Sequence, residues 1–250
     1  MSSKIYSLIQ SHANPEKARV LQRFFKTGKG EYAEGDIFLG IIVPIQRTIA
    51  KQYRAISLND VERLLQSPIH EHRLIALFIM IDQFKHGDEK IRKLIFNFYI
   101  KNVAHINNWD LVDLSAPSIV GEYIRFEDTK RSEVPPKSSD KEDKVGITTL
   151  HSFAKSHNLW KRRIAMIALF ADIKNHRFDR AITVAEILVH DKHDLIHKAV
   201  GWMLREIGKR GGMKEEEEFL KKYTSTMPRT MLRYAIERFP EKLRKQYLQK

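Results

Sequence analysis

Apolar and polar residues follow one another with the period of an α-helix over most of this chain. Apolar side chains recur every three or four positions, and the strict alternation of a half-buried strand is almost absent. Capping residues mark helix starts, as in Asn14-Pro15-Glu16, and glycines mark helix ends, as in TGKGEYAEGD. The pattern predicts an all-α fold with helices near residues 15–25, 43–53, 59–66, 69–86, 88–103, 109–125, 147–156, 158–174, 177–190, 194–210, 213–224, 228–238 and 240–248.

Four of these helices share a motif in which a cation precedes an apolar stripe: HRLIALFIMI, KRRIAMIALF, HKAVGWMLRE and RTMLRYAIER. The step from Arg163 to Lys198 is 198 − 163 = 35 residues, and the step from Lys198 to Arg229 is 229 − 198 = 31 residues. Steps of this length are typical of helix-pair repeats, which bury their apolar faces by stacking. We therefore predict repeats stacked into a curved solenoid with a basic concave face; a globular helical bundle is the alternative.

One segment interrupts the helical pattern. Residues 126–144, FEDTKRSEVPPKSSDKEDK, are charged, include two prolines and contain few apolar side chains. Such a composition predicts a mobile surface loop. Because similar helices continue on both sides, we expect a single domain over residues 1–250.

The charge balance narrows the choice of partner. The chain has 44 Lys+Arg against 31 Asp+Glu, which gives a net charge of +13 and a pI of about 9.8. Such an excess favours binding to nucleic acid, while membrane surfaces and acidic proteins are alternatives. The absence of cysteine excludes disulfides, thiolate metal sites and cysteine nucleophiles, and fits a reducing compartment. The N-terminus lacks a signal-peptide core, and the most apolar run, residues 74–81, is too short to cross a bilayer. We expect a soluble cytoplasmic protein.

Five residues on predicted helices form the candidate functional set. Trp109 and Asp113 are four positions apart in NNWDLVD, and Trp202 and Arg205 are three apart in GWMLRE, so each pair shares a helix face. Arg163 lies on the helix LWKRR. Aromatic rings suit stacking or cations, and the planar guanidinium suits phosphate. Together these residues favour a nucleic-acid partner.

Each of these residues also has a structural interpretation. A carboxylate among apolar neighbours is costly to bury unless it is paired. Asp113 is therefore either ion-paired with an arginine of the next helix or a catalytic carboxylate, and Asp110 competes for that role. Trp109 and Trp202 suit the core equally well, and both arginines suit a solvated surface. Gly201 predicts close helix packing or a neighbouring ring that needs room.

Other familiar motifs give weak signals. His190, His193 and His197 have spacings that suit metal ligands on a helix, but a helix junction is expected between the first two, so we expect no metal. HExxH, Walker-type and GxGxxG patterns do not occur in the sequence. The acidic run at 214–218 complements the start of a helix.

Several segments resemble the DNA alkylation repair glycosylases of the AlkD type, which are built from HEAT-like helical repeats. The similar segments are NNWDLVDLSAPSIVGEYI, LWKRRIAMIALF, IHKAVGWMLREIGKR, FLGIIVPIQR and MPRTMLRYAIERFP. The resemblance covers roughly residues 4–245. It implies that Asp113, Trp109 and Trp202 are catalytic and that Arg163 and Arg205 bind DNA. The loop at 126–144 is longer than the usual connection of the family.

The resemblance also implies a reaction, hydrolysis of the N-glycosidic bond of cationic N3- or N7-alkylated purines in duplex DNA. Asp113 would stabilise the positive sugar and hold the attacking water, and the two tryptophan rings would face the sugar. Arg163 and Arg205 would grip phosphates. The family is expected to act without a base-flipping pocket, metal or organic cofactor, and we expect a monomer.

Two functions of other classes stay open. A non-catalytic protein of the same fold that binds damaged or branched DNA would show salt-sensitive binding without base release. A helical-repeat scaffold for an acidic protein would bind a ligand with which duplex DNA does not compete. The repeats and the charge allow both functions, whereas Trp109 and Asp113 favour the glycosylase.

Overall fold

In the computed structural model, which describes residues 2–133 and 145–249, the chain is helical between its turns, with one isolated bridge, between Ile37 and Ile69. The predicted all-α fold is confirmed. The chain divides into two compact units, Met1–Ser115 (unit 1) and Ala116–Lys250 (unit 2). The curved solenoid and its basic concave face stay predictions.

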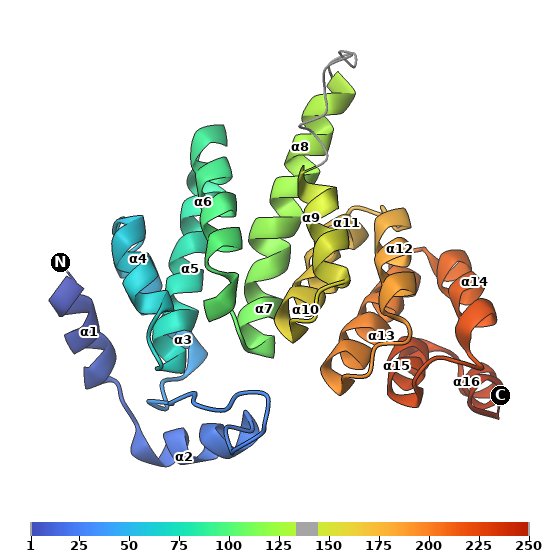
Figure 1. Cartoon of the computed structure of the whole chain (residues 1–250), viewed down its shortest axis with the longest axis horizontal. Helices are drawn as coiled ribbons and strands as arrows, with labels where there is room; N and C mark the ends of the chain where they lie inside the picture. The colour runs from blue at the N-terminus through green and yellow to red at the C-terminus, as the bar shows by residue number, and fades with distance from the viewer. Residues whose placement is uncertain (1, 134–144, 250) are drawn as a thin grey trace. The chain divides into compact units, whose positions relative to one another are not determined.

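Unit 1 is built around one buried helix, which lies between α4 and α6 in Figure 1. This helix, α5 (His70–His86), packs against α3, α4, α6 and α7, and its residues from His70 to Met80 are all buried. Helix α2 lies across one end of the unit (Figure 1). The other helices of unit 1 are α1 (Ser2–Ser11), α2 (Pro15–Phe24), α3 (Val43–Gln52), α4 (Leu58–Leu65), α6 (Glu89–Lys101), the 3₁₀ helix η1 (Val103–His105) and α7 (Trp109–Ser115).

The ends of α2 follow the local sequence, whereas α1 does not appear in the sequence-based prediction. The side chain of Asn14 accepts a hydrogen bond from the backbone N–H of Lys17, and Pro15 occupies the first helical position. Helix α1 has only two fully buried apolar residues, Ile5 and Ile9, one turn apart. It packs on α3, and this tertiary contact stabilises a helix with a weak local signal.

Unit 2 is centred on α13 (Asp194–Lys209), which packs against α10, α12, α14 and α15. Helices α10, α13 and α15 pack in succession and contain Arg163, Lys198 and Arg229, the cations of the predicted repeat. The other elements of unit 2 are the π-helix η2 (Ala116–Gly121), α8 (Glu122–Glu133), α9 (Val145–Ala154), α10 (Leu159–Ala168), α11 (Phe170–Lys174), α12 (Asp179–Leu188), α14 (Met213–Tyr223), α15 (Arg229–Ala235), the 3₁₀ helix η4 (Ile236–Arg238) and α16 (Glu241–Gln249).

Three sequence-based boundaries need correction. The continuous helix expected over 109–125 is interrupted by η2, which contains Pro117; proline lacks an N–H and cannot join the ladder of backbone hydrogen bonds. Residues 126–133, expected in the charged loop, continue α8, and residues 134–144 lie outside the described residues. The helix expected over 158–174 breaks at Leu169 into α10 and α11.

Gly201 lies at a close approach of α13 to α15. A Cβ atom at this position would lie 2.4 Å from the carbonyl oxygen of Met231 and 2.5 Å from Cβ of Tyr234. The sequence predicted either close helix packing at Gly201 or a neighbouring ring that needs room, and close helix packing is confirmed. The next residue, Trp202, belongs to the candidate set, so this contact also helps to place its ring.

We expect Gly201→Ala to lower the free energy of unfolding by about 1–3 kcal/mol, because the added methyl must push two helices apart. Urea titration followed by circular dichroism measures the change. Lys209→Ala, at an exposed position on the same helix, is the matched control and should change stability by less than about 0.5 kcal/mol. Equal stability of Gly201→Ala and the wild type would contradict the close packing.

Candidate functional site

The ring of Trp109 is held in place from several directions in unit 1. It stacks on Phe25, with ring centroids 5.3 Å apart and planes 16° apart, and meets the edge of Phe24 at 6.1 Å. Its indole N–H donates a hydrogen bond to the hydroxyl of Tyr32 at 3.2 Å. The backbone N–H of Trp109 donates to the side-chain oxygen of Asn108 at 2.8 Å. The half-buried indole is therefore a fixed surface at the start of α7.

Asp113 lies one turn after Trp109 on α7 and is half-buried. The nearby hydroxyl of Tyr99 is fully buried and pairs with Oγ of Ser115 at 3.0 Å. Burial raises the pKa of Tyr99 above its usual range, and the carboxylate of Asp113 raises it further. Tyr99 therefore stays protonated, and its neutral hydroxyl adds no negative charge near the carboxylate of Asp113.

Asp110, the competing carboxylate in the sequence, belongs to a polar network. His70 at the start of α5 lies between two acids: Nδ1 is 3.1 Å from Asp36, and Nε2 is 2.8 Å from Asp110. Asp36 also accepts hydrogen bonds from Arg73 at 2.6 Å and from the amide of Asn108 at 3.1 Å. Because the carboxylate of Asp110 is bonded to His70, it has a structural role in this network. Asp113 stays the carboxylate that we expect to be catalytic.

The network changes the charge states of its members. Burial by itself would lower the pKa of His70, but the two carboxylates outweigh burial and raise it to about 9. Burial would raise the pKa of Asp36, but hydrogen bonds from His70 and Asn108 and the charge of Arg73 hold it below its usual value. At neutral pH His70 is therefore protonated and Asp36 is ionised.

Sequence analysis did not identify this network. Asp36 and His70 are 34 residues apart, and Asp110 is another 40 residues along the chain. One signal was present in HEHR at residues 70–73, where polar residues precede a run of eight apolar positions, 74–81, on the same helix. Polar groups at the buried start of a helix need partners, but the sequence does not name those partners.

Aromatic rings connect the network to Trp109. Phe25 stacks on Phe38 with ring centroids 4.9 Å apart, and Phe38 stacks on His70 at 4.5 Å. Phe25 also lies 5.0 Å from His70 and stacks on Trp109, so the four rings form one contiguous cluster between α5 and α7. We call Trp109, Phe25, Phe38 and His70 the aromatic cluster.

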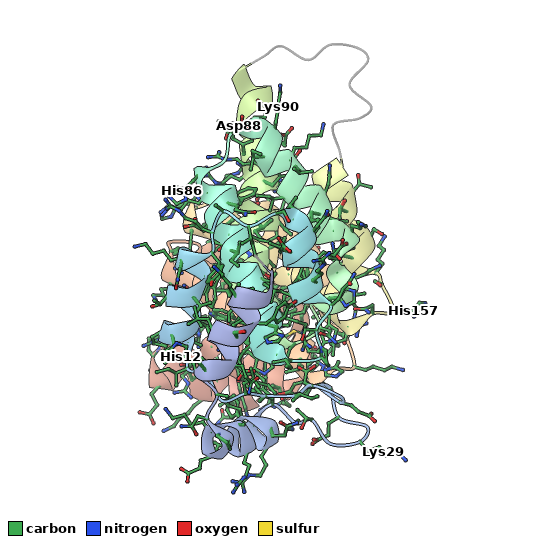
Figure 2. All side chains as sticks on the ribbon, turned by 90° about the vertical axis from the view of Figure 1, so that its left-hand side faces the viewer. His12, Lys29, His86, Asp88, Lys90 and His157 are labelled. Carbon is green, nitrogen blue, oxygen red and sulfur yellow. The ribbon has the colours of Figure 1, made fainter. Side chains whose placement is uncertain are left out.

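An apolar pocket of about 410 Å³ lies in the same part of unit 1, lined by residues of α2, of the segment between α2 and α3, of α3 and of α5, and by Asp110. Large apolar patches on a protein surface mark contact surfaces. The loop after α2 adds cations, and Lys29 on this loop points away from the protein (Figure 2). Four apolar side chains that line the pocket are exposed: Val20, Phe24, Ile42 and Val43.

In unit 2, Trp202 is half-buried on α13 and lies against Phe170, with ring centroids 5.8 Å apart. Two cations lie over the ring of Phe170, the ammonium of Lys174 at 4.6 Å and the guanidinium of Arg210 at 5.0 Å. Trp202 therefore adjoins a cationic part of unit 2 rather than a purely apolar core.

The two candidate arginines differ in their surroundings. Arg163 on α10 is only 4% exposed, and its guanidinium donates a hydrogen bond to the backbone carbonyl of Leu195 in the first turn of α13. Arg205 has 19% of its side chain exposed and forms an ion pair with Glu237. The sequence predicted that both arginines contact phosphate. In the structure Arg163 is bonded inside the protein, whereas Arg205 is partly exposed to solvent.

The three histidines considered as metal ligands have other partners. The ring of His190 meets that of Tyr223, Nδ1 of His193 accepts the N–H of Leu195, and Nε2 of His197 lies 2.5 Å from the carbonyl oxygen of Asp191. Within residues 2–133 and 145–249, no group of three or more histidine and acidic side chains is arranged to hold a metal ion. Among the same residues, no helix has the length and apolar character to cross a membrane.

Comparison with known proteins identifies the family. A family model described as DNA alkylation repair enzyme matches residues 5–239. The chain belongs to this family. The resemblance predicted from the sequence is therefore confirmed. Membership makes the chain an enzyme of alkylated-DNA repair, with DNA as its partner.

Solved structures with low sequence identity share the fold. A predicted DNA alkylation repair enzyme from Enterococcus faecalis is 17% identical, with a TM-score of 0.68 over 92% of this chain and 98% of that chain. AlkD2 from Streptococcus mutans is 20% identical, with a TM-score of 0.52 over 90% of this chain and 98% of that chain. The protein smu.31 from Streptococcus mutans is 21% identical, with a TM-score of 0.52 over 80% of this chain and 93% of that chain. No curated protein matches the chain in sequence.

Proposed function

We propose that this protein is a DNA glycosylase that hydrolyses the N-glycosidic bond of N3- or N7-alkylated purines in duplex DNA. The observation that carries the proposal is the pair on α7, where the half-buried carboxylate of Asp113 lies one turn from the fixed indole of Trp109. Membership of the DNA alkylation repair enzyme family supports the substrate class.

The chemistry follows from the charge that develops on the sugar. Alkylation at N7 or N3 makes the purine a good leaving group, and the glycosidic electron pair departs with the base as C1′ becomes cationic. A carboxylate at Asp113 stabilises this cation and orients the water whose oxygen bonds to C1′, while the released proton passes to the carboxylate or to solvent. The face of Trp109 stabilises the cationic sugar further. No step needs a cofactor.

Trp202, Arg163 and Arg205 are proposed contributors from unit 2. The half-buried ring of Trp202 lies in a cationic environment that suits the sugar–phosphate backbone. Arg205 would exchange its surface partner Glu237 for a phosphate, an exchange of one anion for another. The phosphate contact of Arg163 stays a proposal, because its guanidinium is buried and bonded to the carbonyl of Leu195.

We expect Arg205→Ala to weaken binding to undamaged duplex DNA and to lower the slope of log K against log salt by about 1, because one phosphate contact and its released counterions are lost. Fluorescence anisotropy at several salt concentrations measures both quantities. Lys221→Ala, which removes an exposed cation on α14, is the matched control and should leave the slope unchanged.

Arg163→Ala separates the two roles of that residue. Loss of DNA binding at unchanged stability would support a phosphate contact, whereas loss of stability alone would assign Arg163 to the interior. A wild-type binding constant that does not change with salt would contradict the DNA-binding surface as a whole.

The proposal is tested by single-turnover release of 7-methylguanine from methylated duplex DNA. Release above the rate of spontaneous depurination supports a glycosylase. Tight, salt-sensitive binding without release of any N3- or N7-alkylated purine would favour the alternative, a non-catalytic protein that binds damaged or branched DNA.

A further inference from the structure

His70 is a buried titratable group of unit 1 that the proposed chemistry does not use. Only 2% of its side chain is exposed, and each ring nitrogen faces a carboxylate from a different segment. Asp36 lies in the segment between α2 and α3, whereas Asp110 lies in the first turn of α7. His70 itself begins α5, the helix at the centre of the unit.

Two polar routes lead from His70 to the start of α7. In the first, Nε2 donates to Asp110, whose other carboxylate oxygen accepts the backbone N–H of Leu111 at 2.8 Å. In the second, Nδ1 donates to Asp36, which also accepts the side-chain amide of Asn108. Asn108 in turn accepts the backbone N–H of Trp109 through its side-chain oxygen. Asp110, which follows Trp109, is therefore bonded to His70 directly, and Asn108, which precedes it, is bonded to His70 through Asp36.

The aromatic cluster is a third route, which connects His70 to the indole itself. The His70 ring lies 4.5 Å from Phe38 and 5.0 Å from Phe25, and Phe25 stacks on Trp109 at 5.3 Å. Stacked rings in a packed interior resist tilting, because moving one of them opens a gap beside the next. A change at His70 is therefore transmitted both to the backbone and to the ring of Trp109.

We propose that His70 is a positioning residue for base release: by bonding Asp110 and Asp36 at the same time, it fixes the first turn of α7 and thereby the ring of Trp109 and the carboxylate of Asp113. This inference rests on the proposed glycosylase function. It assigns His70 no contact with DNA.

The bonding pattern requires the imidazolium form. A neutral imidazole has one N–H and can donate to one carboxylate only, whereas the imidazolium donates to both. The charged groups that face the ring are Asp36, Asp110 and Arg73, with two negative charges against one positive charge. Their balance raises the pKa of His70 to about 9. Because this value is higher than the unfolded value of 6.5, the stabilisation is complete below pH 6.5 and is lost as the pH rises through about 9.

The test compares His70→Gln with His72→Gln in the full chain. Both N–H groups of glutamine are on one nitrogen, so its amide cannot donate to two carboxylates that lie at different ring nitrogens of His70. His72 is a matched control on the same helix, because it is also buried but its Nδ1 pairs with Ser67 at 2.8 Å. We expect His70→Gln to slow single-turnover base release by roughly 10- to 100-fold at saturating enzyme, and the half-saturating concentration to change little. His72→Gln should stay within about twofold of the wild type.

Two further readouts distinguish positioning from general destabilisation. The chain contains three tryptophans, so the indole N–H signals in a ¹⁵N NMR spectrum are few. In His70→Gln we expect the Trp109 signal to shift or broaden, while the signals of Trp160 and Trp202 in unit 2 stay in place and report an intact fold. The rate of the wild type should fall as the pH rises through about 9, and this fall should be absent in His70→Gln.

Asp110→Asn is a second variant that leaves His70 bonded to Asp36. If His70 acts through Asp110, the double variant should release base no more slowly than the slower single variant. A His70→Gln protein with a wild-type rate and a wild-type Trp109 signal would overturn the inference, as would slower release with an unmoved Trp109 signal. If the wild type releases no base, the proposed function fails, and the Trp109 signal alone then decides whether His70 positions α7.

Discussion

Replacing Asp113 with asparagine is expected to reduce single-turnover release of 7-methylguanine from duplex DNA by at least about 100-fold. Asparagine has nearly the same shape but no negative charge, so it stabilises a cationic sugar poorly and is a weak acceptor for the proton of water. Asp113 is half-buried on α7, where its charge acts through less solvent than it would on an open surface.

The same variant should bind DNA as tightly as the wild type or more tightly, since the change removes a negative charge that repels phosphates. Asp82→Asn on α5 is the matched control, because Asp82 is a carboxylate with 31% of its side chain exposed and its neighbour is His86. Normal base release by Asp113→Asn would remove this carboxylate from the mechanism. Loss of release in both variants would indicate that charge in general, rather than Asp113, is required.

Replacing Glu71 with alanine is expected to lower the free energy of unfolding by roughly 3–6 kcal/mol. The carboxylate is 1% exposed and accepts three backbone N–H groups, from Leu39 at 2.9 Å, Gly40 at 2.8 Å and Ile41 at 3.2 Å. Alanine leaves these donors without their partner, and each buried N–H without a partner costs about 1–3 kcal/mol. Gly40 has φ +82° and leaves no room for a Cβ beside Asn14, so the loop cannot readily rearrange.

Urea titration of Glu71→Ala measures the loss of stability, and Glu34→Ala is the matched control. The carboxylate of Glu34 also accepts a backbone N–H, from Gly30 at 2.8 Å, but that bond is exposed to solvent. Water replaces a lost exposed partner, so the control should change stability by less than about 1 kcal/mol. Equal effects of the two variants would mean that burial does not determine the strength of these bonds.

The sequence by itself determined the features that depend on neighbours within one or two helical turns. Hydrophobic periodicity and caps such as Asn14-Pro15 predicted the all-α fold and most helix positions, because backbone hydrogen bonds and caps join residues three or four positions apart. The same local geometry placed Trp109 and Asp113 one turn apart on α7. Family resemblance, carried by short segments of similar sequence, was confirmed across residues 5–239.

Two predicted helix boundaries were wrong, although the residues that explain the observed boundaries are visible in the sequence. Pro117 lies within the expected helix 109–125, and its missing N–H accounts for the π-helical segment there. Helix α8 continues to Glu133 because charged residues are compatible with a helix as well as with a loop. Composition alone did not distinguish these two states.

Only the tertiary structure decided which polar groups are buried and with what partners. Asp36, His70 and Asp110 come from three segments of unit 1, and Glu71 on α5 binds a loop 30 residues earlier in the chain. Arginine is usually found on the surface, but Arg163 lies in the interior and is bonded to the carbonyl of Leu195. Burial and pairing depend on which distant segments pack together, and that packing is the joint result of many weak contacts that no local pattern records.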